Sequence, residues 1–377
     1  MTRTTRHTLL CTVGTSLLDG NLRRLTETTP KRPDNWEVLR HATDERNWPR
    51  VAAELLRVPP DARVCGAEIN TIEHIRRRKD VDLQRIVFLV SDTEAGRDTG
   101  EVLRRYFEAR EDLALEAVEV AVIEALQDER PWDFKQHGLR NLVRKMGRYI
   151  REYGQDYLAI DATGGYKAQI AIAALVGQAL GVPVFYKHER FGSLIDFPPM
   201  PVAFDYALLG EHAGLLAALE KGVTLTEAET GPIPLRLRVL LTDVCVDGQT
   251  LYELSPIGQI FVESYRARHP KPVTLPSAQD RRPPRFRDDH YPAGFKEFVE
   301  KVWRENEWIV SAHSRPYDKQ KGIAGIGFNI QPTPEGPELI GTYHRDFGAR
   351  FRILLAPDAT EEQLTHAAVL LNERYGS

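Results

Sequence analysis

The sequence predicts an α/β fold for residues 1–202 and a smaller α+β unit at the C-terminal end of the chain. Two observations lead to this prediction. In the first part, continuous apolar runs alternate with helical patterns, which is typical of a parallel sheet covered on both faces. After residue 290, one amphipathic helical pattern precedes several alternating runs and a closing helix. At 377 residues, the chain is also too long for one ordinary core.

The expected strands of the N-terminal part end in small and hydroxyl residues at two places. The strand candidates are HTLLCTVG, RIVFLVS, LEAVEVAVI, YLAIDAT and VPVFYKH. The first candidate runs into residues 12–16 (TVGTS), and the fourth runs into residues 161–167 (DATGGYK) before an apolar helix. Ligands of parallel sheets bind beyond the carboxyl ends of the strands, where the chain order reverses. We therefore expect both strand ends to face one crevice, together with Asp92.

A strand that stops at a double glycine exposes backbone N–H groups at a helix start, which suits an anion. Gly164, Gly165 and Lys167 are spaced too closely for the phosphate loop of nucleotide triphosphatases. A ligand with several phosphates and no magnesium fits this pattern better. The alternative is that the glycines only allow close helix packing. The candidate ligand-binding residues are Thr12, Gly14, Thr15, Ser16, Asp92, Thr163, Gly164, Gly165, Tyr166 and Lys167.

The middle of the chain, residues 203–272, predicts a helix, a two-stranded turn at Asp247-Gly248, and a helix that begins at Ser255-Pro256. This order resembles a small winged helix. The last helix carries Arg266 and Arg268 only at its end, so a spacer or dimerisation element is favoured over DNA binding. Residues 273–290 are rich in proline and predict an extended, exposed linker.

Residues 291–377 predict a compact α+β unit with strands in WIVSAHS, IAGIGFNI, ELIGTYH and RFRILLA, and a closing helix that starts at Thr360. Basic and aromatic residues dominate its candidate active face, with almost no acidic residues. The unit resembles RelE-type mRNA interferases, and this resemblance implies metal-free RNA cleavage. That reaction needs a base for the 2′-hydroxyl, an acid for the leaving oxygen, and cations for the phosphorane. The alternative for His313 and Tyr343 is a place in the core. The candidates are His313, Tyr343 and His344 for proton transfer, and Arg315, Lys319, Lys321, Arg345, Arg350 and Arg352 for charge stabilisation.

Composition excludes several classes of protein. The three cysteines are odd in number and far apart, which argues against a disulfide framework or a zinc site. The net charge of -4 does not by itself mark a nucleic-acid binder. No apolar run is long enough to span a bilayer, and the N-terminus is interpreted as a first strand rather than a signal peptide. We expect a cytoplasmic protein with no membrane partner, no metal and no resident cofactor.

Four motifs carry a resemblance to a known family. LCTVGTSLL, GAEINTIEHI, IVFLVSDTEAGR and IDATGGYKAQIAIAAL, in this order, resemble the CARF domain of CRISPR-associated effectors over about the first 200 residues. The resemblance implies a Rossmann-like homodimer that senses cyclic oligoadenylate, with residues 12–16 and 161–167 lining its pocket. Cyclic tetra-adenylate (cA4) is the expected allosteric activator, and other ring sizes stay open.

The C-terminal unit resembles RelE-type mRNA interferases in size, element order and residue types. Together the two resemblances imply a CARF–RelE fusion, a cyclic-oligoadenylate-activated, metal-independent endoribonuclease that cleaves mRNA on the ribosome in type III CRISPR antiviral defence. The predicted domains are a sensor (1–202), a winged-helix-like connector (203–272), a linker (273–290) and a RelE-like ribonuclease (291–377).

Two other functions stay open. A ligand-responsive transcription regulator would bind DNA through the connector. A CARF–HEPN ribonuclease would use an Arg-x4-6-His motif, whose spacing Arg285 and His290 satisfy. HEPN domains are all-helical, whereas Pro283, Pro284 and Pro292 should keep this stretch out of a helix.

Overall fold

The computed structural model describes residues 5–188, 193–269, 275, 277–287, 290–316 and 327–376. The chain divides into two compact units. The first unit is Met1–Val202 with Arg266–Arg268, and the second is Ala203–Tyr265 with His269–Ser377. The finer division into sensor, connector, linker and C-terminal domain stays a prediction. None of the described helices is long and apolar enough to cross a membrane.

A six-stranded sheet of order β3-β2-β1-β4-β5-β6 forms the centre of the first unit. Strands β1 to β5 are parallel, and β6 pairs antiparallel with β5, so the predicted parallel sheet is confirmed. The chain order reverses between β1 and β4, which makes their carboxyl ends the topological switch point. The strands are β1 (Arg6–Thr12), β2 (Val81–Ser91), β3 (Ala117–Ile123), β4 (Leu158–Asp161), β5 (Val184–Tyr186) and β6 (Ile195–Phe197).

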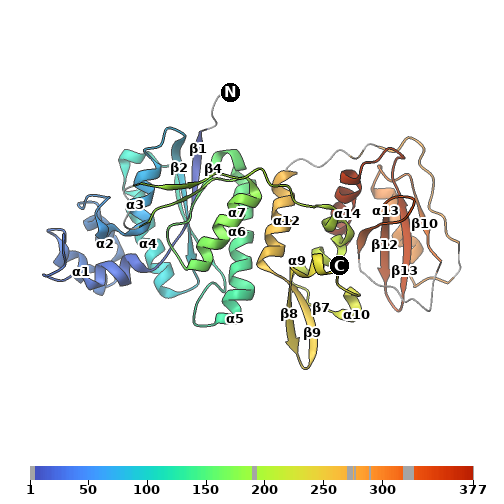
Figure 1. Ribbon diagram of the computed structural model, residues 1–377, viewed down its shortest axis with the longest axis horizontal. Coiled ribbons are helices and arrows are strands. Elements are labelled where there is room, and N and C mark those ends of the chain that lie inside the picture. Colours follow the sequence, from blue (N-terminus) through green and yellow to red (C-terminus); the bar gives the residue numbers. More distant parts are fainter. Residues whose placement is uncertain are drawn as a thin grey trace. The chain divides into compact units, whose positions relative to one another are not determined.

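Helices cover both faces of this sheet (Figure 1), with α3 and α4 on one face and α6 and α7 on the other. Residues 8–12 of β1, residues 86–91 of β2 and all of β4 are buried, since helices cover both faces of the sheet there. Residues Leu9 and Cys11 of β1 face the α3 and α4 side, and Leu10 between them is also fully buried. The helices are α1 (Trp36–Asp44), α2 (Trp48–Leu55), α3 (Gly66–Ile75), α4 (Glu94–Glu108), α5 (Pro131–Asp133), α6 (Leu139–Tyr153) and α7 (Lys167–Leu180).

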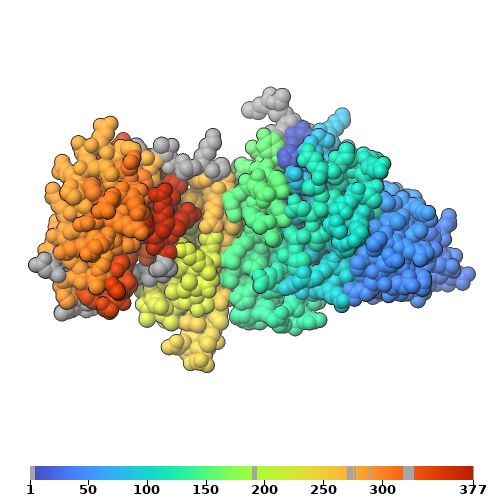
Figure 2. Space-filling view, turned by 180° about the vertical axis from the view of Figure 1, so that it is seen from behind, coloured from blue at the N-terminus to red at the C-terminus, as the bar shows by residue number. Residues whose placement is uncertain are grey.

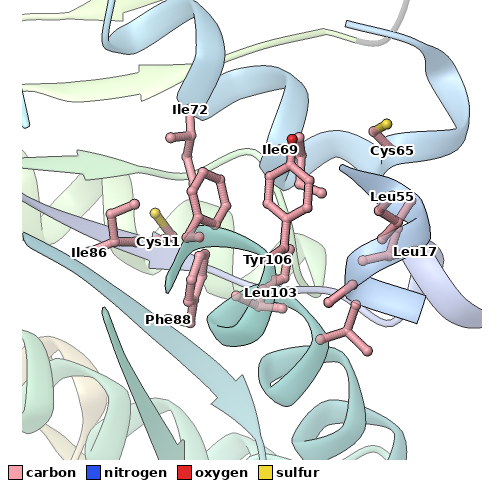
Figure 3. Packing of buried hydrophobic residues seen from close by; sticks show 14 of the residues in the cluster. Cys11, Leu17, Leu55, Cys65, Ile69, Ile72, Ile86, Phe88, Leu103 and Tyr106 are labelled. Carbon is pink, nitrogen blue, oxygen red and sulfur yellow. The ribbon is translucent and has the colours of Figure 1, made fainter. Parts of the chain in front are cut away.

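The core between the sheet and helices α3 and α4 contains large aromatic side chains. Figure 3 shows Phe88 of β2 and Tyr106 of α4 with Cys11 of β1 and with aliphatic side chains from β2, α3 and α4. The ring of Phe88 lies 5.7 Å from that of Phe107. Cys11 and Cys65 belong to this core as free, buried thiols. Close packing here holds α3, and therefore its first turn, firmly against the sheet.

The second unit begins with short helices and a three-stranded sheet of order β7-β9-β8. Asp247 and Gly248 turn the β8–β9 hairpin with positive φ angles of 51° and 77°. The Ser255 hydroxyl accepts a hydrogen bond from the Gly258 N–H at 3.0 Å and starts α12. The predicted turn and helix start are therefore confirmed, and the hairpin protrudes from its unit in the space-filling view (Figure 2). The elements are α8 (Ala207–Glu211), α9 (Ala213–Glu220), β7 (Leu225–Thr226), α10 (Glu227–Thr230), α11 (Leu235–Arg238), β8 (Leu241–Val246), β9 (Gln249–Leu254) and α12 (Pro256–Arg268).

The rest of the second unit contains a four-stranded antiparallel sheet of order β10-β13-β12-β11. Helices α13 and α14 pack on one face of it around Phe295, Phe328 and Phe351. Thr360 and Gln363 form a capping box that starts α14, as predicted. The elements are α13 (Phe295–Glu305), β10 (Ser311–Ser314), β11 (Phe328–Gln331), β12 (Glu338–His344), β13 (Gly348–Leu354) and α14 (Glu361–Tyr375).

Part of the predicted linker lies against this sheet. The backbone N–H groups of Arg282 and Arg285 donate to the carbonyl oxygens of Val310 and Ala312, both at 2.8 Å. Arg285 also forms an isolated parallel bridge with His313 of β10. The segment is extended, as predicted, but it extends the edge of the sheet rather than running free, because an unpaired edge strand leaves its backbone groups without partners.

Candidate functional site

A cavity of about 340 Å³ lies at the switch point of the first unit. Of the predicted ligand residues, Ser16 and Thr163 line it. Two cationic side chains in its wall, Arg63 and Lys187, were missed by the sequence reasoning. Asn70 and Thr71 also line the cavity, and both belong to the GAEINTIEHI motif. This motif is the sequence signal from which they could have been predicted as site residues. The remaining lining residues are Asn21, Asp61, Gly66 and Ala67.

The two strand ends are tied directly to each other. The Thr12 hydroxyl donates to the Gly164 carbonyl at 2.6 Å, and the Gly14 N–H donates to Glu68 Oε1 at 2.9 Å. Gly165 has a φ angle of +98°, a conformation that requires glycine. Thr12 and Gly14 therefore use these donors inside the protein, and neither is among the residues that line the cavity. Their contact with a ligand stays a prediction.

Thr163 connects β4 and β5. Its backbone N–H donates to Asp161 Oδ1 at 3.0 Å, and its hydroxyl accepts from the Lys187 N–H, also at 3.0 Å. This second bond places Lys187 beside Thr163 in the cavity wall. Asp161 is fully buried, and burial raises its pKa to about 7.

Four predicted ligand residues are not among those that line the cavity: Asp92, Tyr166, Lys167 and Thr15. The Asp92 carboxylate accepts from the Ala125 N–H at 3.1 Å and pairs with Arg97, so its contacts lie beside β2 and β3. Its contact with a ligand stays a prediction. Tyr166 packs edge-on against Phe134, with 5.2 Å between ring centroids, and burial raises its pKa to about 12. Lys167 is exposed at the start of α7, and Thr15 is half-buried before residue 16.

The second candidate site is one face of the four-stranded sheet, called the basic face below and made of His313, Arg315, Arg350, Arg352 and Glu338. In β13, the residues between and after the arginines, Phe351 and Ile353, point into the core, so Arg350 and Arg352 project from the opposite face. His313 pairs with Arg352 across β10 and β13. The Arg315 N–H donates to the Arg350 carbonyl at 2.9 Å, which continues the pairing beyond β10.

Glu338 stands among these cations. Its side chain is only 9% exposed, and it pairs with Arg315 and, at 2.9 Å, with Arg352. The expectation of almost no acidic residue on this face is therefore wrong at its centre. Glu338 begins the strand ELIGTYH. Ile340 lies opposite Arg352, and residues two apart in a strand share a face, so Glu338 lies on the basic face as well. A buried carboxylate of this kind holds arginine side chains in a fixed orientation.

The charges on the basic face shift the pKa of its histidine. Burial, and then the positive charges of Arg285, Arg287 and Arg352, lower the pKa of His313 below its usual value. Burial and the charge of Arg315 likewise lower the pKa of Arg350. The face thus combines a neutral imidazole with concentrated positive charge, which suits a phosphodiester and a base that accepts a proton.

The first prediction concerns this imidazole. We expect NMR titration of His313 to give a pKa below the ordinary value of about 6.5. Replacement of Arg285 by Gln should raise that pKa, because it removes a nearby positive charge that disfavours the imidazolium. The matched control is Arg304→Gln, which removes an arginine that is 73% exposed on α13. A His313 pKa at or above its ordinary value, insensitive to Arg285, would contradict this account of the basic face.

The structure separates the other predicted catalytic residues from His313. The Tyr343 ring packs against Phe298, with 5.1 Å between centroids, and its hydroxyl donates to the Ala293 carbonyl at 2.9 Å. Tyr343 therefore lies on the core side, as the alternative interpretation held. His344 and Arg345 are exposed at the end of β12. Lys319 and Lys321 lie outside the described residues.

Two cavities border the basic face within the second unit. One, of about 600 Å³, is lined by His313, Arg285, Arg282 and Asp280 among others, and it provides space beside the imidazole. The other, of about 250 Å³, brings Arg350 and Thr342 together with residues 211–232 of the connector segment, including His212. Within the described ranges, no group of three or more His, Cys, Asp or Glu residues could hold a metal ion.

The proposed HEPN pair is not arranged on helices. Arg285 lies in the extended segment beside β10. The His290 ring stacks on Phe347, with 5.0 Å between centroids. Both residues belong to the surroundings of a β-sheet, which does not match an all-helical domain.

Comparison with known proteins gives one match to a family. Residues 63–200 match the family model of a CRISPR-associated protein, Cas_APE2256. This match supports the interpretation that the chain is a CRISPR-associated protein. A search of curated proteins finds no match.

Among solved structures, the chain is similar to Can2 from Sulfobacillus thermosulfidooxidans in complex with cyclic tetra-adenylate, with 11% identity and a TM-score of 0.25. The alignment covers 69% of this chain, and the chain spans 63% of the length of that protein. A likeness at this level carries no argument about fold or ligand.

Proposed function

We propose that the protein is an endoribonuclease that cyclic oligoadenylate activates, with a CARF-type sensor in the first unit and a RelE-like effector in the second. The observation that carries the nuclease assignment is the basic face, where His313 with a lowered pKa lies among Arg315, Arg350 and Arg352. The CRISPR-associated match over residues 63–200 supports a role in type III antiviral defence.

The sensor would bind its ligand at the switch-point cavity. Arg63 and Lys187 supply positive charge, and Ser16, Asn70 and Thr71 supply polar groups for phosphodiesters and adenines. A cyclic ligand with several phosphates fits two such cavities joined in a homodimer, with cA4 as the expected ring. Asp61 lies in the same wall. Its carboxylate repels a phosphate group, but it can accept a hydrogen bond from a base or a sugar hydroxyl.

Cleavage on the basic face would follow the metal-free route. His313 accepts the proton of the 2′-hydroxyl while the 2′-oxygen attacks the adjacent phosphorus. The bond from phosphorus to the 5′-oxygen breaks, and that oxygen leaves with a proton, giving a 2′,3′-cyclic phosphate and a 5′-hydroxyl. Arg350 and Arg315 stabilise the negative charge of the phosphorane, and Glu338 orients Arg315 and Arg352.

The proton donor for the leaving oxygen is not placed opposite His313 by the described residues. Tyr343 belongs to the core side, and His344 is exposed at the strand end. We propose that mRNA bound on the ribosome is the preferred substrate, because an ordered substrate complex would compensate for an incomplete acid/base set.

The second prediction tests this function. The purified protein is incubated with each ring size of cyclic oligoadenylate and labelled mRNA, with and without ribosomes, in a buffer that contains magnesium. The reactions without ribosomes are repeated in EDTA. We expect ring-dependent cleavage that EDTA leaves intact and that ribosomes increase, with 2′,3′-cyclic phosphate ends. Cleavage that requires magnesium would point to another class of nuclease, and no response to any ring would remove the sensor assignment.

A transcription regulator remains the second candidate. Its recognition helix would be α12, whose arginines Arg266 and Arg268 lie only in the last turn. The polar side chains in the middle of this helix, Gln259, Glu263 and Ser264, are buried. Such a helix favours a spacer over a DNA-reading surface.

A further inference from the structure

Glu68 lies where the two glycine-containing strand ends of the first unit meet. It belongs to the first turn of α3 and is only 1% exposed. Its Oε1 atom accepts the hydrogen bond from the Gly14 N–H at 2.9 Å. A Cβ atom placed on Gly164 would collide with the same Oε1 and would lie 2.7 Å from the Thr12 carbonyl oxygen. One carboxyl oxygen therefore touches both strand ends.

The other carboxyl oxygen lies near the start of its own helix, α3. A Cβ atom on Gly66 would lie 3.5 Å from Glu68 Oε2, and Gly66 lines the switch-point cavity. Oε2 is buried and has no hydrogen-bond partner among the described residues. A buried polar atom without a partner is costly, so the arrangement calls for an explanation beyond packing.

Burial raises the pKa values of Glu68 and of the two titratable side chains beside it. Burial raises the pKa of Glu68, and Asp161, whose pKa burial raises to about 7, lies close enough for the two to interact. Cys11 is the third titratable group beside them, and burial raises its pKa as well. Three titratable side chains are therefore buried together where the strand ends meet.

We propose that Glu68 is a positioning residue that clamps the ends of β1 and β4 and the start of α3 in the spacing that the cyclic-nucleotide cavity requires. The identity of the ligand in this inference rests on the proposed function. The contacts of Glu68 with the strand ends are present in the protein without ligand. Pre-organised loops bind more tightly because less conformational freedom is lost on binding.

The test compares three substitutions at this position. Glu68→Ala removes the clamp, and Glu68→Asp keeps a carboxyl group that is one methylene too short to reach Gly14. Glu68→Gln keeps the acceptor and mimics the protonated acid. The matched control is Glu73→Gln, because Glu73 is also fully buried on α3 but pairs with Arg76 and Arg110, away from the strand ends.

Amide hydrogen exchange of residues 12–16 and 161–167 is measured without ligand, and cA4 affinity by calorimetry. We expect Glu68→Ala and Glu68→Asp to exchange about tenfold faster or more in both segments and to bind about tenfold more weakly, whereas Glu68→Gln and Glu73→Gln stay within about threefold of the parent. Wild-type exchange in both segments of folded Glu68→Asp or Glu68→Ala protein would overturn the proposal. If Glu68→Ala fails to fold, Glu68→Asp decides. If the parent binds no cyclic oligoadenylate, the proposed function fails, and the exchange result alone decides the clamp.

Discussion

Replacement of Arg350 by Ala is expected to lower activator-dependent RNA cleavage by about tenfold or more, which corresponds to about 1.4 kcal/mol of barrier. Arg350 projects from the face opposite the core and is linked through its carbonyl to the Arg315 backbone. Arg315→Ala should have an effect of similar size, with some loss of stability because it leaves Glu338 with one arginine fewer.

Two controls make this result decisive. The double variant Arg285→Ala with His290→Ala should retain most activity at a pH well above the ordinary pKa of histidine, where His313 is neutral with or without the charge of Arg285. These two residues lie in an extended segment and on Phe347 and form no helical active site. Arg304→Ala removes an exposed arginine from the same unit and should behave like the parent. Initial rates with labelled RNA, together with thermal unfolding, measure both. Should the pair prove essential and the strand arginines dispensable, the RelE-like assignment is wrong and the HEPN interpretation replaces it.

Simultaneous replacement of Arg63 and Lys187 by Ala should weaken cyclic oligoadenylate binding by about 100-fold or more. Both side chains line the switch-point cavity, and a charge-assisted hydrogen bond to phosphate is worth about 1.5–3 kcal/mol. Asp61→Asn should have the opposite effect and tighten binding, because it removes a negative charge from the same wall. The opposite signs distinguish an electrostatic contact from a general loss of structure.

Calorimetry with cA4 measures both effects, and Arg57→Ala is the matched control, since Arg57 is 72% exposed and does not line the cavity. Lys167→Ala provides a second comparison: the exposed position of Lys167 predicts a smaller loss than the paired substitution. Unchanged affinity in the double variant would exclude this cavity as the ligand site. A weakened control would show that the loss is not specific to the cavity.

Much of the secondary structure was predictable from local signals. The apolar strand ending at Asp161, the positive-φ turn at Asp247-Gly248 and the capping box at Thr360 each depend on residues within a few positions of one another. Such signals act on the backbone directly, through burial of both strand faces, glycine conformations and side-chain caps. For the same reason, the proline-flanked segment was predicted to avoid helix, and its described residues do.

The sites were predictable only in part because they depend on residues far apart in the sequence. The strand ends at residues 12–16 and 161–167 determined where the crevice would form, and the parallel order of the sheet brings them together. Which of their groups remain available to a ligand was decided by tertiary contacts. Thr12 and Gly14 donate hydrogen bonds to Gly164 and Glu68. The Asp92 carboxylate accepts a hydrogen bond from Ala125.

Local sequence signals are therefore sufficient for the α/β class of the first unit, the order of elements in the second, and the glycine-rich strand ends at the switch point. Long-range contacts bring Arg63 and Lys187 into one wall and turn Tyr343, but not His313, toward the core. They also bury Glu338 among arginines. The physical reason is that helix and strand preferences are local, whereas the cost of burying a charge or a hydrogen-bond donor is set by whichever distant groups the fold brings beside it.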